Sequence, residues 1–256
     1  MRSLSPVHNK VPNATISFAA KALMVIGILK PQPTITEPVI TPPRGINAAY
    51  GEYLAWHASG CAECHTPRDP NTAQLDFTRP LAGGLIPFPE EGFTTTGSNI
   101  TPCQTTGIGD WTERDFLTAM HTGMRPDGTI MLPFHPWPYF DKWSDEDLLA
   151  VWVYLRSLEP VAHQVPTSTL TGAAANATGF ARGEALFGVY CAMCHGEDGS
   201  GGVFTTIELK DVAHEIADAA LAQFIADGFP GSSRHSFGKT LTGDQITDLV
   251  AFIKNW

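Results

Sequence analysis

The chain has 256 residues, which suits one or two domains, and 43% of them are hydrophobic, enough for a packed core. Sixteen Lys and Arg against 26 Asp and Glu leave a net charge of −10, which argues against nucleic acid as a partner because phosphate binding needs clustered cations. No uninterrupted apolar run reaches the roughly 18 residues of a membrane span, and this excludes a polytopic membrane protein.

Residues 1–30 have the pattern of an export segment. Arg2 and Lys10 give a basic start, and a mostly apolar stretch over 16–29 follows. That stretch is short for a membrane span and suits the apolar core of a signal peptide. We therefore expect an export signal or an N-terminal anchor, which would bring membrane association; a loosely packed helix is the alternative. The Pro-rich residues 31–46 are expected to form an extended linker.

Four of the five cysteines form two motifs of the type CxxCH. Two thiols at this spacing on one helical turn can reach the vinyl edge of one porphyrin, and the next residue can bind its iron. The sequence therefore predicts two covalently bound haem c groups. Their thioethers would come from Cys61, Cys64, Cys191 and Cys194, and their proximal iron ligands would be His65 and His195.

Two other uses of CxxC fit the sequence less well. A zinc ribbon needs its two CxxC pairs about 15–20 residues apart. Cys64 and Cys191 are far more widely separated than that. A thioredoxin-like dithiol would lie in a βαβ pattern, and no strand-like runs flank either motif.

After the linker, the chain repeats one helical pattern. Stretches 144–158 and 242–256 both begin with a capping residue and carry apolar residues at helical spacing. Stretches 113–122 and 217–227 both end at a glycine. The repeat predicts an all-α fold of two helical domains, with a long insertion at 66–111 wrapping the haem edge. The domains would span 47–163 and 180–256, joined by a small-residue linker at 164–179.

Both halves resemble class I c-type cytochrome domains. The first resembles the haem domains in cytochrome c subunits of membrane-bound alcohol, gluconate and related dehydrogenases, whereas the second matches only the generic pattern. The likeness in the first half is carried by GCAECHTPR (60–68), LAGG (81–84), NITP (99–102), TGIGDWTERDF (106–116) and RPDG (125–128). The resemblance implies two tandem class I cytochrome c-like helical domains with long loops, and a redox protein as partner.

The resemblance also implies roles for two residues that follow the first motif. The turn at Pro67 would place a carbonyl on the ring N–H of the proximal His65 and so fix its orientation. Arg68 would pair with a haem propionate.

The distal iron ligand is where the chain departs from the family. The family places a methionine in a segment of the form P-x-M-P, and here that segment carries His135. In the second half the methionine position is taken by Arg234, which cannot bind iron, and His235 follows it. We predict His135 and His235 as the distal ligands. The alternatives are Met131, Met124, Cys103 or an open site for the first haem, and His214, an open site or an outside donor for the second.

Two imidazoles on each iron predict low reduction potentials, because it is methionine ligation that raises the potential. They also fill both coordination positions of the iron that a substrate could use. The expected function is electron transfer outside the cytoplasm, in the periplasm or at the cell surface, as the electron-accepting subunit of a dehydrogenase or respiratory chain. No catalytic residue is predicted. One alternative is self-association into an extracellular haem chain; another is a dihaem peroxidase or thiosulfate-oxidising enzyme. Cys103 is expected to be a small buried residue, with intermolecular pairing as the alternative.

Overall fold

The computed structural model describes residues 15–28, 40–84, 88–202, 204–229 and 236–256. They divide into two units, residues 1–40 and 41–256, each of which is described by itself.

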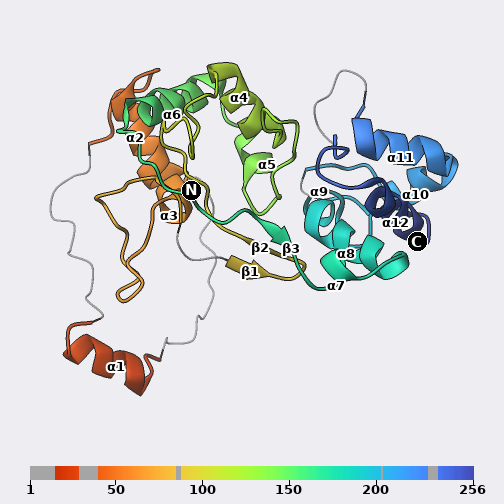
Figure 1. The fold of residues 1–256 in the computed structure, drawn as a ribbon, viewed down its shortest axis with the longest axis horizontal. Helices are drawn as coiled ribbons and strands as arrows, with labels where there is room; N and C mark the ends of the chain where they lie inside the picture. Colours follow the sequence, from red (N-terminus) through yellow and green to blue (C-terminus); the bar gives the residue numbers. More distant parts are fainter. Residues whose placement is uncertain (1–14, 29–39, 85–87, 203, 230–235) are drawn as a thin grey trace, which may run out of the picture. The chain divides into compact units, whose positions relative to one another are not determined.

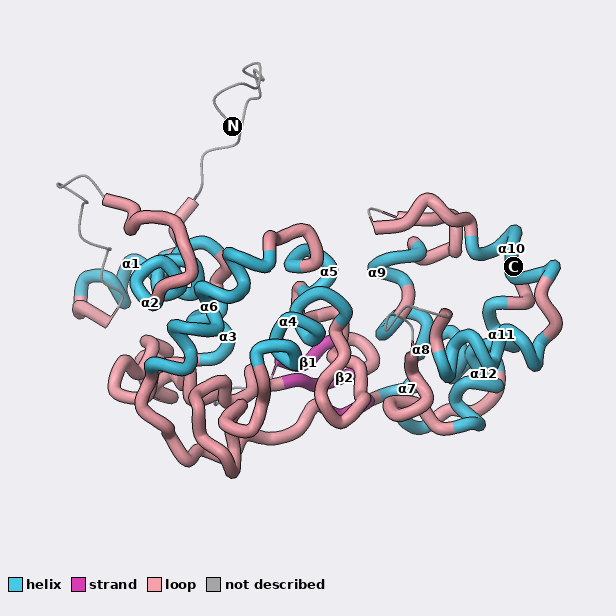
Figure 2. Tube along the Cα trace, turned by 90° about the horizontal axis from the view of Figure 1, so that it is seen from above, coloured by secondary structure: helices cyan, strands magenta, loops and turns pink. Residues whose placement is uncertain are grey.

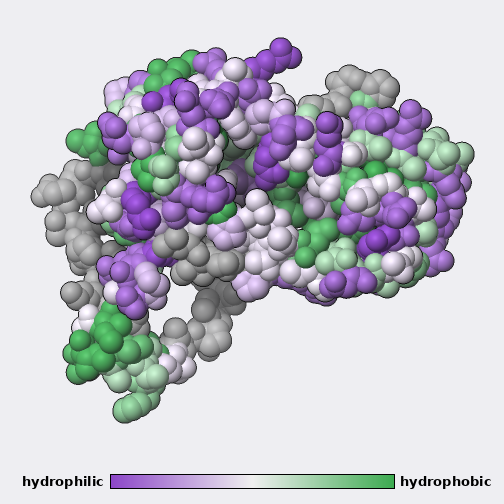
Figure 3. Space-filling view, in the orientation of Figure 1, coloured by the Kyte–Doolittle hydropathy of each residue, from purple (hydrophilic) through white to green (hydrophobic). Residues whose placement is uncertain are grey.

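The N-terminal unit contains one short helix, α1 (Phe18–Val25), whose first turn is capped by the side chain of Ser17. Its apolar side chains are exposed, Phe18 to 88% and Val25 to 86%. They form the apolar patch on this unit in Figure 3. Across the described ranges, no helix has both the length and the apolar character to cross a membrane. Export or anchoring by residues 1–30 stays a prediction.

Helices build both halves of the larger unit, and the prediction of an all-α fold is confirmed (Figure 1). The first half, residues 41–163, contains α2 (Ala48–Tyr53), the π-helix η1 (Leu54–Ala58), α3 (Cys61–His65), α4 (Glu113–Thr122), α5 (Trp137–Phe140) and α6 (Asp145–Ser157). The second half, residues 164–256, contains α7 (Gly172–Asn176), α8 (Phe180–Tyr190), α9 (Ala192–His195), α10 (Leu209–Glu215), α11 (Asp218–Asp227) and α12 (Gly243–Ile253).

The opening and closing helices of each half cross at a glycine. At Gly51 of α2, a Cβ would lie 1.9 Å from the carbonyl oxygen of Ala150 on α6. At Gly183 of α8, a Cβ would lie 2.1 Å from the carbonyl oxygen of Asp248 on α12. Only glycine lets two backbones approach this closely. The pairs Gly51-Glu52 and Gly183-Glu184 in the sequence therefore mark the same helix crossing in both halves.

Each half has its own apolar core around that crossing. In the first half, the buried residues include Leu54, Phe116, Leu148, Val151 and Leu155. In the second half, they include Leu186, Phe187, Leu249, Val250 and Ile253, and this cluster also takes in Phe93 and Ile130 from the first half. The two halves therefore share apolar contacts. The predicted domain boundaries stay a prediction.

The structure has the predicted caps at Thr242 and Gly123 and a further one at Thr112. Thr112 and Asp115 form a reciprocal capping box at the start of α4, and Thr242 and Gln245 form one at the start of α12. Gly123 ends α4 in the left-handed conformation, with φ +77°.

A small antiparallel sheet was not predicted. Its strands are β1 (Phe88–Glu90), β2 (Phe93–Thr95) and β3 (Thr169–Leu170), in the order β1-β2-β3. Phe93 pairs with Leu170, so the insertion of the first half is joined to the small-residue linker at 164–179. The strands are drawn in magenta in Figure 2. Strands of two or three residues leave no alternating pattern long enough to detect in a sequence.

Candidate haem sites

The first CxxCH motif forms a single helical turn, α3, which begins after Gly60 in the left-handed conformation. The His65 ring Nδ1 lies 2.7 Å from the carbonyl oxygen of Ser98. A carbonyl can only accept, so Nδ1 carries the hydrogen and Nε2 keeps the lone pair that a metal needs. Burial lowers the pKa of His65, against the opposing effect of the Ser98 hydrogen bond. His65 is therefore neutral at pH 7 and presents Nε2 as a ligand.

The long insertion holds this turn from the proximal side. The N–H of Gly83 donates to the carbonyl of His65 over 2.7 Å. At Gly97, a Cβ would lie 1.9 Å from the carbonyl oxygen of Cys64. The carbonyl that orients His65 thus comes from Ser98, after Gly97, and the expectation that Pro67 supplies it is wrong. A backbone carbonyl carries no sequence signal, although the glycines of LAGG and TTTGSN do mark the close approach.

The ring of His135 lies close to the ring of His65. The two ring centroids are 6.1 Å apart and the ring planes are inclined at 69°. Burial, with the nearby His65 and Arg125, lowers the pKa of His135 to about 3, so this ring is neutral as well. Its Nδ1 is buried and has no hydrogen-bond partner within the described ranges. The structure brings together the predicted proximal and distal ligands of the first haem.

The spacing of these two rings fits a metal ion between them. An imidazole nitrogen binds a first-row metal ion at about 2.0–2.1 Å. A five-membered ring with bonds of about 1.33 Å places its nitrogen roughly 1.1 Å from the ring centre. Two imidazoles on opposite faces of one iron would thus have centres about 6.3 Å apart, close to the 6.1 Å between His65 and His135.

The cysteines fit thioether formation better than zinc binding or dithiol chemistry. Burial raises the pKa of Cys61 and takes that of Cys191 to about 12. Disulfide exchange needs the thiolate, which these surroundings disfavour. No group of three or more His, Cys, Asp or Glu side chains within the described residues could hold a metal ion by itself.

The second motif repeats the backbone contacts of the first. The N–H of Gly201 donates to the carbonyl of His195 over 2.9 Å, as Gly83 does to His65. At Gly202, a Cβ would lie 2.6 Å from the carbonyl oxygen of Cys194. Equivalent glycines therefore pack against both CxxCH turns.

The predicted distal ligand of the second haem, His235, lies outside the described residues. The alternative ligand His214 lies on α10, where its Nε2 is 3.1 Å from the carbonyl oxygen of Trp256. That carbonyl requires Nε2 to be the protonated nitrogen.

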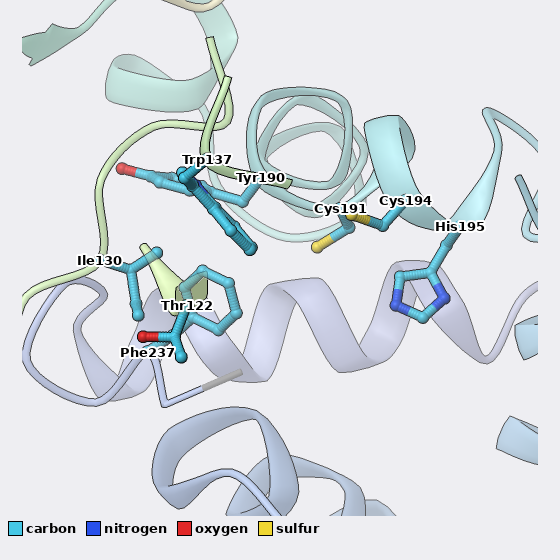
Figure 4. Close-up of a pocket in the computed structure, with 8 residues that line it drawn as sticks. All are labelled: Thr122, Ile130, Trp137, Tyr190, Cys191, Cys194, His195 and Phe237. Atoms are coloured by element: carbon cyan, nitrogen blue, oxygen red, sulfur yellow. The ribbon is translucent and has the colours of Figure 1, made fainter. Parts of the chain in front are cut away.

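A pocket beside the second motif has walls from both halves (Figure 4). The second half contributes Tyr190, Cys191, Cys194, His195 and Phe237. The first half contributes Thr122, Ile130 and Trp137, none of which was predicted as a site residue. Contacts between the two halves leave no pattern in the local sequence. The only sequence signal for a first-half residue in this pocket is the position of Trp137, two residues after His135.

The remaining predicted residues have other contacts. Arg68 donates hydrogen bonds to the carboxylate of Glu63 and to the carbonyl of Ala73. Its pairing with a propionate stays a prediction. Met124 packs against the apolar cluster of the second half. Cys103 is buried, and its sulfur is 3.4 Å from the hydroxyls of both Thr105 and Thr106.

Two helical halves, each with a CxxCH turn held by glycine backbone contacts, define a c-type cytochrome. Residues 178–253 match the family model described as cytochrome c oxidase, cbb3-type, subunit III, so this part of the chain contains a cytochrome c domain. The predicted class and haem c as the type of cofactor are confirmed.

Relatives with curated names extend the similarity to the first half. The gluconate 2-dehydrogenase cytochrome c subunit of Pantoea cypripedii is 38% identical over 113 residues, which are 44% of this chain and 23% of that protein. The alcohol dehydrogenase (quinone) cytochrome c subunit of Gluconacetobacter polyoxogenes is 27% identical over 281 residues, 99% of this chain and 58% of that protein. A diheme cytochrome c-type protein of Cereibacter sphaeroides is 29% identical over 146 residues, 56% of this chain and 48% of that protein. The chain spans less than two thirds of each of these relatives.

Proposed function

We propose that this protein is a two-haem electron carrier whose first haem is held between two imidazoles. The thioethers would form at Cys61 and Cys64, with His65 and His135 as axial ligands. The observation that carries the proposal is the 6.1 Å between the centroids of two neutral rings, the buried His65 and the half-buried His135. When bound, the haem iron supplies one-electron exchange between its ferric and ferrous states.

The protein's own groups hold that site in one geometry. The Ser98 carbonyl fixes the tautomer and orientation of His65. The N–H of His135 donates to the carbonyl of Leu132 over 3.0 Å, and the carbonyl of His135 accepts from Trp137 over 2.7 Å. With both imidazoles bound, the iron would have no coordination position left for a substrate, which favours electron transfer over catalysis. Two imidazoles also favour a low potential.

For the second haem we propose attachment at Cys191 and Cys194 with His195 as proximal ligand, and His235 as distal ligand. Support for the attachment comes from the glycine contacts that this turn shares with the first one. Support for His235 comes from the sequence, because it follows the position at which the family places its methionine and the second half has no methionine after Met193.

We further propose that the carrier accepts electrons from a dehydrogenase outside the cytoplasm. The names of two relatives, cytochrome c subunits of gluconate 2-dehydrogenase and alcohol dehydrogenase (quinone), support this partner. Copurification of the tagged protein with a flavin- or quinone-cofactor dehydrogenase is the expected result. Haem-containing filaments without such a partner would favour self-association instead.

The ligand assignment is tested on the oxidised, mature protein. The intact mass should exceed that of the polypeptide by two haems. Electron paramagnetic resonance with near-infrared magnetic circular dichroism should report bis-imidazole ligation and no methionine charge-transfer band. A methionine band, a high-spin haem or a mass with fewer than two haems would each contradict the proposal.

A further inference from the structure

One segment of the first half serves both haem sites. Residues 122–137 end with His135, the proposed ligand of the first haem, and Trp137. The same segment supplies Thr122, Ile130 and Trp137 to the pocket that contains Cys191 and His195. The wall of the second site is therefore built partly from the polypeptide that holds the first.

Trp137 is the residue that connects the two sites most directly. Its backbone N–H donates to the carbonyl of His135 over 2.7 Å. Its indole extends into the pocket beside Tyr190 and Cys191 (Figure 4). The indole Nε1 is buried and has no acceptor in the part of the chain that the structure describes. A buried N–H without an acceptor is costly, so this donor points to an occupant of the pocket other than the described residues.

The indole is held in place on its other side. At Gly123, which has a φ of +77°, a Cβ would lie 2.6 Å from Cε2 of Trp137. The backbone of Gly123 thus packs directly on the ring, and no other residue would fit there without displacing it.

The segment is also anchored to the second half. The N–H of Ile130 donates to the hydroxyl of Thr240 over 2.8 Å. The rings of Tyr139 and Phe204 meet edge to face with centroids 4.8 Å apart. These contacts fix the indole relative to the CxxCH turn of the second half.

We infer that Trp137 forms the contact between the two haem groups and that electrons pass between them across its indole. This inference rests on the proposed two-haem function. In each transfer, one electron leaves the ferrous iron of one haem and reduces the ferric iron of the other. No bond forms or breaks and no proton moves. The protein's contribution is the packed aromatic ring that fills the space between the groups.

The test is nuclear magnetic resonance of the haem methyl groups in partly reduced protein, for the wild type, Trp137→Leu and Trp111→Leu. Rapid exchange within the molecule gives each methyl group one averaged signal, independent of protein concentration. We expect averaged signals for the wild type and for the Trp111→Leu control, whose tryptophan lies in the first half but does not line the pocket. For Trp137→Leu, the exchange should slow severalfold, and the signals should broaden or separate.

The outcomes separate this inference from the proposed function. A wild-type mass with fewer than two haems would overturn the proposed function. Two haems with unaveraged signals in the wild type, or unchanged averaging in Trp137→Leu, would overturn only the role of Trp137. If Trp137→Leu fails to acquire both haems, Trp137→Phe is measured instead, because phenylalanine keeps an aromatic ring but is smaller than the indole. Exchange as fast as in the wild type would then overturn the inference.

Discussion

Gly183 lies so close to Asp248 that the two helices carrying them are in backbone contact. A Cβ at Gly183 would come within 2.1 Å of the carbonyl oxygen of Asp248. The Asp248 carboxylate also accepts hydrogen bonds from the N–H of Gly179 and from Arg182 at the start of α8. The crossing of α8 and α12 is thus fixed by a glycine and by one carboxylate.

The variant Gly183→Ala is expected to destabilise the protein, because neither backbone can move without separating the two helices. Overpacking of this kind costs about 3 kcal/mol of unfolding free energy. At roughly 2–4 °C per kcal/mol for a chain of this size, the melting temperature should fall by roughly 6–12 °C. Calorimetry or thermal circular dichroism measures the change.

The same helix offers a matched control in Gly188. A Cβ there would meet nothing within 4 Å, so the only effect of Gly188→Ala is the lower backbone entropy of the unfolded chain. This should raise the unfolding free energy by about 0.5–1 kcal/mol. If both alanine variants changed the melting temperature in the same direction, the close crossing at Gly183 would not be what stabilises α8.

The local features of the fold could be predicted from the sequence, and the long-range ones could not. Thr112, Thr242 and Gly123 act on their own helix ends, so neighbouring residues in the sequence are enough to predict them. The pairing of Phe93 with Leu170 joins residues that are far apart in the chain and is visible only in the structure.

In the candidate haem sites, too, the sequence predicts the local features and not the long-range contacts. His65 and His195 follow from a five-residue motif, whose chemistry is local. Ser98 acts through its backbone carbonyl, and Trp137 acts through contact with the other half. Neither role depends on a pattern of side chains along the sequence.

Replacing His135 with methionine tests the ligand position directly. Thioether sulfur favours the ferrous state more than imidazole does, so His135→Met should raise the potential of one haem and leave the other unchanged. Axial ligands and surroundings set haem potentials over about 0.8 V, so we expect a rise of at least ~0.1 V. Potentiometric titration measures the rise, and a methionine charge-transfer band should accompany it.

An exposed histidine provides the control for this change. His57 lies on η1 and is exposed, so His57→Met should leave both potentials and the spectra unaltered. If the haem potentials shifted equally in His135→Met and His57→Met, or in neither variant, His135 would not be an iron ligand.

Gly97→Ala tests the backbone contact behind the first haem. The added Cβ would lie 1.9 Å from the carbonyl oxygen of Cys64 and would displace the chain that carries the Ser98 carbonyl. We expect haem attachment at Cys61 and Cys64 to fall, while attachment at the second motif continues. Intact mass spectrometry should show a shift from two haems per chain toward one. Gly243→Ala, at a position with nothing within 4 Å, should keep both haems; equal loss in the two variants would contradict the role of this contact.

The thiol of Cys103 should make stability depend on pH. Hydrogen bonds with the side chains of Thr105 and Thr106 lower its pKa from 9.0 to about 6. A thiol whose pKa is lower in the folded than in the unfolded protein stabilises the folded state at pH values above its unfolded-state pKa. This stabilisation is lost as the pH falls through the folded-state pKa. The contribution is therefore complete above about pH 9, shrinks as the pH falls, and is absent below about pH 6. The difference in unfolding free energy between the wild type and Cys103→Ser should grow with pH across this window.

Thr105→Val identifies the source of that dependence. Valine keeps the volume of threonine and removes the hydroxyl, which is the largest cause of the lowered pKa of Cys103. The folded pKa should then move back toward 9.0, so the window in which stability rises with pH should narrow from its lower end. Denaturant unfolding at several pH values measures this. A Thr105→Val variant with the full wild-type dependence would show that Thr106 alone sets the thiol's pKa, and no dependence in the wild type would show that Cys103 keeps an ordinary thiol pKa.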